Sequence, residues 1–196
     1  RKGDADRARK RDGNFASPGG SLRGGLLGAE AAMNEGSSLK GRFVRESASE
    51  YSEVALPNDA NPLGHLLGGR VMHLVDLAGA LAAMRHARLP VVTASVDHMT
   101  FLHPVHIGQL LTLKSSVNRV FRTSMEVGVK VLVEDLTTGE VRHTSSAYLT
   151  FVALDKDGKP TPIPPVIPET PDEKRRYEEA GHRRAYRLEL RARNRK

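Results

Sequence analysis

The 196-residue sequence contains no cysteine and no tryptophan, and aromatic residues make up only 5% of it. Without cysteine the chain can form no disulfide framework, no thiolate zinc site and no cysteine nucleophile. The scarcity of aromatic residues leaves little for stacking on nucleic-acid bases. No stretch approaches eighteen uninterrupted apolar residues, and the N-terminus alternates charged residues with Gly and Ser. We therefore expect neither a membrane span nor a signal peptide, and a soluble, cytoplasmic protein.

Charge is distributed unevenly along the chain. Overall, 30 Lys and Arg outnumber 23 Asp and Glu, which gives a net charge of +7 and a pI near 9.9. By segment, Arg1–Arg45 carries +5, Glu46–Pro171 carries −3 and Asp172–Lys196 carries +5. A basic chain invites a nucleic-acid interpretation. Because the excess lies at the two ends and the middle is acidic, we do not expect nucleic acid to be the partner of the central segment.

Composition divides the chain into four segments. Residues 1–45 are rich in Arg, Asp, Gly and Ser and bury too little to offset the entropy of ordering, which predicts a flexible basic arm. Residues 46–155 show clear hydrophobic periodicity and form the predicted domain. Six prolines between positions 160 and 171 make residues 156–171 an extended tether. Residues 172–196 are typical of a charged, solvated helix or tail.

The central segment predicts one long helix among strands. Gly64–Arg88 has apolar residues almost all round a helical wheel, so we expect this helix to be buried on most sides. A short strand over Glu50–Leu56 precedes it, and a β-rich stretch over Val91–Leu102 follows. Alternating apolar and polar residues then predict three more strands, at positions 111–121, 125–133 and 141–154.

This order of elements predicts an α+β fold in which an antiparallel sheet wraps around one buried helix. Short connections favour antiparallel neighbours, and the apolar face of the sheet needs the helix to cover it. Such a sheet leaves one edge strand and one face poorly covered, which makes self-association expected.

Candidate chemistry gathers at the start of the predicted helix. Asn61 precedes the helix, and Gly68 and Gly69 lie at its opening. A helix N-terminus with glycine can bring free backbone N–H groups close to a ligand oxygen. The alternative is that these glycines only permit a tight turn and close packing, and no nucleotide-binding glycine fingerprint is present.

One carboxylate stands out in the middle of the same helix. Asp76 lies between two apolar residues, where aspartate is a poor helix former and burial of its charge is costly. Arg70, His73 and Asp76 are spaced three residues apart. This spacing predicts either a polar stripe that leads to a cleft or a merely solvated face.

Other chemistries find less support. None of the eight histidines has a zinc-ligand spacing such as H-E-x-x-H, and no G-x-S-x-G elbow marks a serine nucleophile, so we expect no metal and no serine triad. Arg122, Thr123 and Ser124 form a turn between two predicted strands. They could contact a phosphate, or they could be a solvated surface turn.

The segment Asp59–Gly69, followed by Met72 and Asp76, resembles the hotdog-fold acyl-CoA thioesterases of the bacterial YciA and brain acyl-CoA hydrolase type. Further segments are similar to the later strands of that family, in order: Val92–Asp97, Phe101–Val105, Arg122–Val127 and Tyr148–Asp155. The resemblance covers about residues 46–170 and needs neither tail.

This resemblance implies a hotdog fold of one strand, one helix and four strands, and hydrolysis of an acyl-CoA to a free fatty acid and CoA. It implies a homo-oligomer in which two hotdogs pair, often as a trimer of such dimers, that is, a homohexamer. CoA is then part of the substrate, and no separate cofactor is expected. An acyl-CoA-binding hotdog without catalysis, a hotdog dehydratase that uses His65 or His73, and a nucleic-acid-binding protein driven by its tails stay as alternatives.

The resemblance also assigns roles to residues. Asp76 matches the catalytic carboxylate of the family and Asn61 its catalytic asparagine, contributed to one site by opposite protomers. Gly68 and Gly69 match the glycines whose backbone N–H groups polarise the thioester carbonyl. For the phosphates of CoA, we select Arg122, Thr123 and Ser124.

Overall fold

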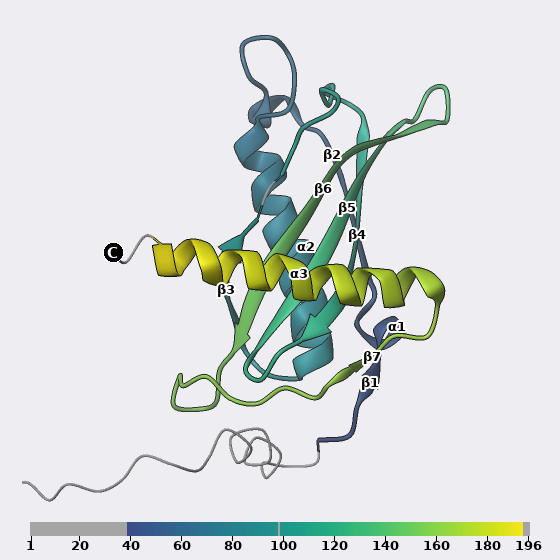
Figure 1. The fold of residues 1–196 in the computed structure, drawn as a ribbon. Coiled ribbons are helices and arrows are strands. Elements are labelled where there is room, and N and C mark those ends of the chain that lie inside the picture. Colours follow the sequence, from purple (N-terminus) through teal and green to yellow (C-terminus); the bar gives the residue numbers. More distant parts are fainter. Residues whose placement is uncertain (1–38, 98, 194–196) are drawn as a thin grey trace, which may run out of the picture. The chain divides into compact units, whose positions relative to one another are not determined.

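The computed structural model describes residues 39–97 and 99–193, drawn in colour in Figure 1. Most of the predicted basic arm, residues 1–45, lies outside the described residues. Its last residues belong to the folded unit, which begins at Leu39. They contribute β1 (Arg42–Phe43) and the first residues of a short helix.

This N-terminal stretch is held by the segment that was predicted to be an extended tether. β1 pairs in parallel with β7 (Val166–Ile167), and α1 (Val44–Ser47) follows directly. Val44 is buried in α1, and Ile163 is buried just before β7. The proline-rich segment therefore packs against the domain, because its few apolar residues complete the core.

A five-stranded antiparallel sheet forms the centre of the fold. Three register shifts, one in each of three strand pairs, allow the sheet to curve. The strands lie in the spatial order β2 (Ser49–Val54), β4 (Leu110–Val120), β5 (Ser124–Asp135), β6 (Glu140–Ala153) and β3 (Val91–Val96).

The predicted strands all occur, but β3 pairs with a strand far from it in sequence. β3 ends at Val96, well before the predicted Leu102, and lies at the edge of the sheet beside β6. The long α2 carries the chain from one edge of the sheet to the other, and residues 97–109 return it to β4. The rule that neighbours in sequence pair therefore does not hold for β3 and β4.

One long helix, α2 (Gly68–Ala87), lies along one face of the sheet (Figure 1). Its buried residues, among them Leu74, Val75 and Ala82, join the core with the inward side chains of the strands. At Gly79 the helix comes so close to the sheet that a Cβ atom would lie 3.0 Å from the Phe151 ring. The predicted hotdog arrangement, a sheet curled around one helix, is confirmed.

The helix is not buried on most sides, in contrast to the prediction. Large apolar side chains on its outward side are 37–46% exposed: Leu67, Met72, Leu77, Leu81 and Met84. Of these, Leu77, Leu81 and Met84 lie on one side of the helix, and large apolar side chains that gather on a protein surface indicate a binding interface. Apolar residues do surround the helix, but within this chain the sheet covers only one side of it.

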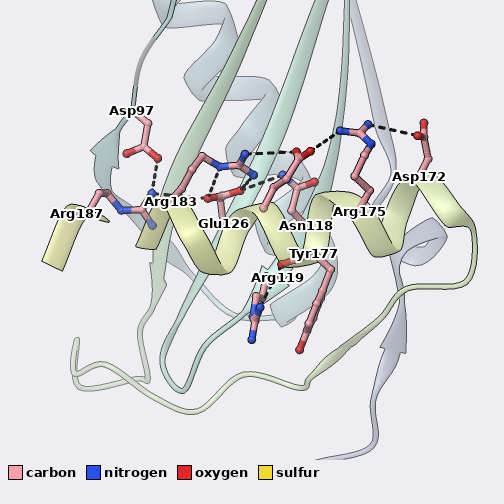
Figure 2. Close-up of polar contacts among 10 residues, drawn as sticks. Asp97, Asn118, Arg119, Glu126, Asp172, Arg175, Tyr177, Arg183 and Arg187 are labelled. Atoms are coloured by element: carbon pink, nitrogen blue, oxygen red, sulfur yellow. Dashed lines mark hydrogen bonds and ion pairs between the residues drawn. The ribbon is translucent and has the colours of Figure 1, made fainter. Parts of the chain in front are cut away.

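The charged C-terminal segment forms α3 (Pro171–Arg193), which crosses the other face of the sheet (Figure 1). The helix is not simply solvated, because Ala180 is fully buried and Arg183 donates to the buried carboxylate of Glu126 on β5 at 2.7 Å (Figure 2). None of the helices in the described part of the chain is long and apolar enough to cross a membrane.

Candidate functional site

Asn61 is fixed by the loop that joins the short helix η2 (Pro57–Asp59) to α2. Its side-chain Oδ1 accepts hydrogen bonds from the backbone N–H groups of Leu63 at 2.9 Å and His65 at 3.1 Å. The loop turns at Gly64, whose φ of 76° suits glycine. Both N–H groups donate, so the atom of the Asn61 amide that faces them must be the oxygen. Its Nδ2 therefore points away from these two N–H groups, and none of the described residues accepts a hydrogen bond from it.

The start of α2 offers further donors. Leu67 precedes the helix and gives it no side-chain cap. No carbonyl of the described residues accepts a hydrogen bond from the N–H of Gly68 or Gly69. Asn61 and Gly68 line one cavity of about 270 Å³, with Phe101 in its wall. The structure thus brings Asn61 and the helix start together, as the sequence predicts.

Asp76 lies two turns further along α2 and meets the edge strand. The hydroxyl of Thr93 on β3 donates to Oδ1 of Asp76 at 2.6 Å. At 1.5 Å per residue, Asp76 is about 12 Å along the helix axis from Gly68. Asp76 does not line the cavity that holds Asn61, so one chain does not assemble the whole predicted set.

Thr93 contacts the candidate residue Asp76, but the sequence did not single it out. It belongs to the segment Val92–Asp97 that carries the family resemblance, but it has no feature that distinguishes it from other threonines on strands. Only its position distinguishes it. Thr93 lies on the edge strand β3 beside α2, where its hydroxyl can reach a carboxylate in the middle of that helix.

Of the two arrangements predicted for Arg70, His73 and Asp76, the polar stripe that leads to a cleft does not form. Arg70 turns toward β2, where it pairs with Glu53 and lies 3.2 Å from Asp59. Asp76 turns toward β3 on the other edge, and no His73 contact to Asp76 is found among the described residues. Steps of three residues rotate by 60° around a helix of 3.6 residues per turn, so Arg70 and Asp76 diverge.

The predicted phosphate-binding turn lies at another place. Arg122 is exposed, and Oγ of Ser124 accepts from Nη1 of Arg184 on α3 at 3.3 Å. Ser124 therefore faces α3, whereas Asp76 lies on the α2 face of the sheet. Within one chain, the turn and Asp76 are on opposite sides of the sheet.

Histidines near the cavity make ring contacts. His65 and His106 meet edge to face, with ring centroids 4.7 Å apart. Among the described residues, no three His, Asp or Glu side chains gather in a way that could hold a metal ion.

Comparison with known sequences gives a consistent set of relatives. Residues 63–140 match the family model described as Thioesterase superfamily. The chain is 43% identical to protein VdlD of Helicobacter pylori (strain ATCC 700392 / 26695), over 69% of this chain and 78% of that protein. It is 43% identical to YkhA of Bacillus subtilis (strain 168), an uncharacterized acyl-CoA thioester hydrolase, over 67% and 77%. A cytosolic acyl coenzyme A thioester hydrolase of Rattus norvegicus is 34% identical, over 71% of this chain and 37% of that one.

Solved structures agree with these relatives. An apo-hexameric acyl-CoA thioesterase is 42% identical with a TM-score of 0.76, over 79% of this chain and 99% of that one. An acyl-CoA hydrolase from Staphylococcus aureus, in complex with butyryl coenzyme A and coenzyme A, is 35% identical with a TM-score of 0.74, over 79% and 94%. Three variants of that hydrolase, in which an aspartate, an asparagine or a threonine is replaced by alanine, are each 34% identical with TM-scores of 0.73 to 0.76, over 79–80% of this chain and 94–96% of theirs.

Proposed function

Because the chain belongs to the hotdog-fold thioesterase superfamily, we propose that it hydrolyses acyl-CoA to a free acid and CoA, with Asp76 as the reacting carboxylate. The observation that carries the proposal is the Thr93 hydroxyl bound to Asp76 beside a helix whose first N–H groups are free. The names of the relatives, which include acyl-CoA thioester hydrolases, support the substrate class.

Sequence spacing supports the choice of residues. The asparagine, aspartate and threonine that are replaced in the S. aureus variants have the same separations along their chain as Asn61, Asp76 and Thr93 have here. The last two are 17 residues apart in both proteins. Two matching intervals between three residues of matching type favour a common set of side chains.

The thioester carbonyl would be polarised at the start of α2. As the carbonyl carbon becomes tetrahedral, negative charge develops on its oxygen, and fixed donors stabilise that charge more than they stabilise the ground state. The free N–H groups of Gly68 and Gly69 and the positive end of the helix dipole supply such donors. Nδ2 of Asn61 adds a donor that orients the water or the carbonyl.

Asp76 would supply the attack. It either takes a proton from a water molecule, whose oxygen then attacks the carbonyl carbon, or attacks that carbon itself to give a mixed anhydride that water hydrolyses. In both routes the C–S bond breaks, and CoA leaves as a thiolate that takes up a proton. The hydrogen bond from Thr93 to Oδ1 holds the carboxylate in place and leaves Oδ2 to react.

A complete site would need two chains. Asn61 and Asp76 of one chain lie in different places, and the outward side of α2 exposes large apolar residues. We propose that two hotdogs pair across this face, so that Asn61 of one protomer meets Asp76 of the other. The hexameric relatives support further assembly of such dimers into a trimer. The name of the rat relative supports a cytosolic location.

The test is release of free thiol from acyl-CoAs that range from acetyl to palmitoyl. The proposal predicts turnover of at least one chain length, at a rate proportional to protein concentration. Binding of every acyl-CoA without thiol release would favour the acyl-CoA-binding alternative. Loss of water from a hydroxyacyl-CoA, or addition of water to an enoyl-CoA, without thiol release would favour the dehydratase.

A further inference from the structure

A second, smaller cavity lies between α3 and the outer face of the sheet, on the side opposite Asp76. It measures about 140 Å³, which is large enough for one small anion. Its polar lining consists of three hydroxyl groups and three guanidinium groups: Ser95, Ser124, Thr150, Arg184, Arg187 and Arg191. No carboxylate is among the residues that line it in the described part of the chain.

Two of these hydroxyls are buried without a partner. Ser95 on β3 and Thr150 on β6 are paired residues of neighbouring strands, so both hydroxyls lie side by side. Neither Oγ of Ser95 nor Oγ1 of Thr150 has a hydrogen-bond partner among the described residues, although both atoms are buried. An unsatisfied buried hydroxyl costs about 1–3 kcal/mol, so two adjacent ones indicate an acceptor that binds there.

Two of the three cations that line the cavity, Arg184 and Arg191, are uncompensated. Arg184 is half-buried, lies over the Phe121 ring at 4.1 Å and makes one long hydrogen bond, to Ser124. Burial lowers the pKa of its guanidinium, and the positive charges of Arg187 and Arg119 lower it further. In the described residues, no carboxylate lies within ion-pair distance of Arg184 or Arg191.

Two other arginines of the same helix, unlike Arg184 and Arg191, form ion pairs with carboxylates. Arg183 binds both carboxylate oxygens of the buried Glu126, at 2.7 and 3.1 Å, and Arg187 pairs with Asp97 (Figure 2). These pairs neutralise two cations and clamp α3 onto the sheet. With α3 fixed on the sheet in this way, the charge that remains in the lining of the cavity is positive.

We propose that this cavity binds a phosphate-type anion. Arg184 and Arg191 would supply the positive charge, and the hydroxyls of Ser95 and Thr150 would donate to the anion's oxygens. A tetrahedral oxyanion carries enough acceptor sites for several such donors at once, and guanidinium groups match its geometry. The shared chemistry is a phosphate group, carried either by CoA itself or by a separate phosphorylated compound.

This site is distinct from the proposed reaction centre. Thr93 and Ser95 lie on the same strand, but Thr93 faces Asp76 and α2, whereas Ser95 faces α3. The anion site depends on the cavity alone, and it does not require that the chain hydrolyse thioesters.

The test is isothermal titration calorimetry, in which the full chain is titrated with pyrophosphate in chloride buffer and the binding affinity is measured. We expect Arg184→Gln to weaken binding about tenfold, the loss expected for one charge-assisted contact of about 1.4 kcal/mol. Arg193→Gln is the matched control: it removes one charge from the same helix outside the cavity, where Arg193 pairs with Glu189, and its affinity should equal that of the wild type. Absence of pyrophosphate binding, or equal affinities of the two variants, would overturn the proposal.

A second variant guards against a fold defect. Thr150→Val keeps the shape of the side chain and removes the orphaned hydroxyl, so the protein without anion should melt at a higher temperature than the wild type. Pyrophosphate should then raise its Tm less than it raises that of the wild type. An equal rise in both proteins would contradict the role of Thr150.

Competition identifies the source of the phosphate. If CoA displaces pyrophosphate from the wild type and dephospho-CoA, which lacks the 3′-phosphate, does so more weakly, the anion belongs to the substrate. If neither displaces it, a separate phosphorylated ligand fills the site.

Discussion

At the scale of single residues, the hydroxyl of Thr93 makes the hydrogen bond that holds Asp76, the proposed reacting group. Its hydrogen bond to Asp76 is 2.6 Å long and charge-assisted. We expect Thr93→Val to lower kcat about tenfold, because loss of about 1.4 kcal/mol of positioning energy corresponds to that factor. Thr93→Ser keeps the hydroxyl and should restore most of the rate. The measurement is kcat for thiol release, and equal rates in Val and Ser variants would contradict this role.

His86 predicts how stability depends on pH. Its ring is buried, Nε2 donates to the carbonyl of Pro164 at 2.8 Å, and Nδ1 has no partner among the described residues. Burial lowers the pKa of His86 below 6.5, although the hydrogen bond to Pro164 opposes this. Between the folded and unfolded pKa values, the unfolded chain binds more protons, so stability is complete above about pH 6.5 and falls as the pH drops.

The check is the free energy of unfolding in urea between pH 5 and pH 7.5. A single proton gives a slope of at most about 1.4 kcal/mol per pH unit. His86→Gln should flatten this slope, whereas His103→Gln, which changes an exposed histidine, should leave it unchanged. A wild-type slope that persists in His86→Gln would exclude the buried histidine as its origin.

Residues differ in how well the sequence predicts them. Asp76 draws attention in the sequence because a carboxylate between apolar residues in mid-helix is costly, but its catalytic role is a prediction from the family resemblance. Thr93 and Ser95 were not predictable, because threonine and serine are common on strands and their facing depends on the bulge between them. The partners of Arg70 could not be predicted either, since Glu53 comes from a strand 17 residues earlier.

At the scale of elements, α3 shows how a strongly charged helix can be part of a core. Its anchor is the pair between Arg183 and the fully buried Glu126, which also accepts from Asn118 at 3.1 Å. We expect Glu126→Gln to destabilise the fold by roughly 3 kcal/mol, because it leaves a guanidinium partly buried without its partner. Urea denaturation measures the change.

A control on the same helix separates this effect from general charge loss. Glu189→Gln removes an exposed partner of Arg193 and should cost less than about 1 kcal/mol. The double variant of Glu126→Leu with Arg183→Met should be more stable than Glu126→Gln, because it leaves no unpaired charge. If Glu126→Gln and Glu189→Gln prove equally stable, α3 is not anchored by this pair.

The elements themselves follow from hydrophobic periodicity, but their partners do not. The alternation along β4, β5 and β6 predicts strands with one buried face, and the structure has them. Periodicity carries no information on which strands pair, so the neighbour relation of β3 and β6 was not predictable. The docking of α3 was missed because its pattern is charged, and the partner of Arg183 lies 57 residues away.

At the scale of the whole molecule, the net charge of +7 has a partial explanation. Part of the basic excess lies on α3, where arginines neutralise carboxylates of the sheet or line a cavity. The exposed apolar side chains of α2 are a second feature of this scale, and they are the surface across which we propose that two chains pair. From composition alone, the arginines of α3 suggest binding to nucleic acid, and the apolar residues of α2 suggest a fully buried helix. The structure instead places the arginines against the sheet and leaves part of the apolar residues exposed.

The shared site can be tested by mixing inactive chains. Asn61→Ala and Asp76→Asn should each be inactive alone. If the two residues come from opposite protomers, co-refolded mixtures should recover about a quarter of the wild-type activity, since half of the random dimers carry one intact site of two. Thiol release from the mixture is the readout. No recovery, despite mixed oligomers shown by mass spectrometry, would place both residues in one chain's site.

The proposed activity depends most on the carboxylate of Asp76, and one measurement tests that role directly. The rate of thiol release from the best acyl-CoA substrate is compared for the wild type, Asp76→Asn and the matched control Asp157→Asn, which changes an exposed turn residue in the same way. We predict that Asp76→Asn loses at least about a hundredfold in kcat with its oligomeric state intact, while Asp157→Asn stays at the wild-type rate. A wild-type rate in Asp76→Asn would contradict the account.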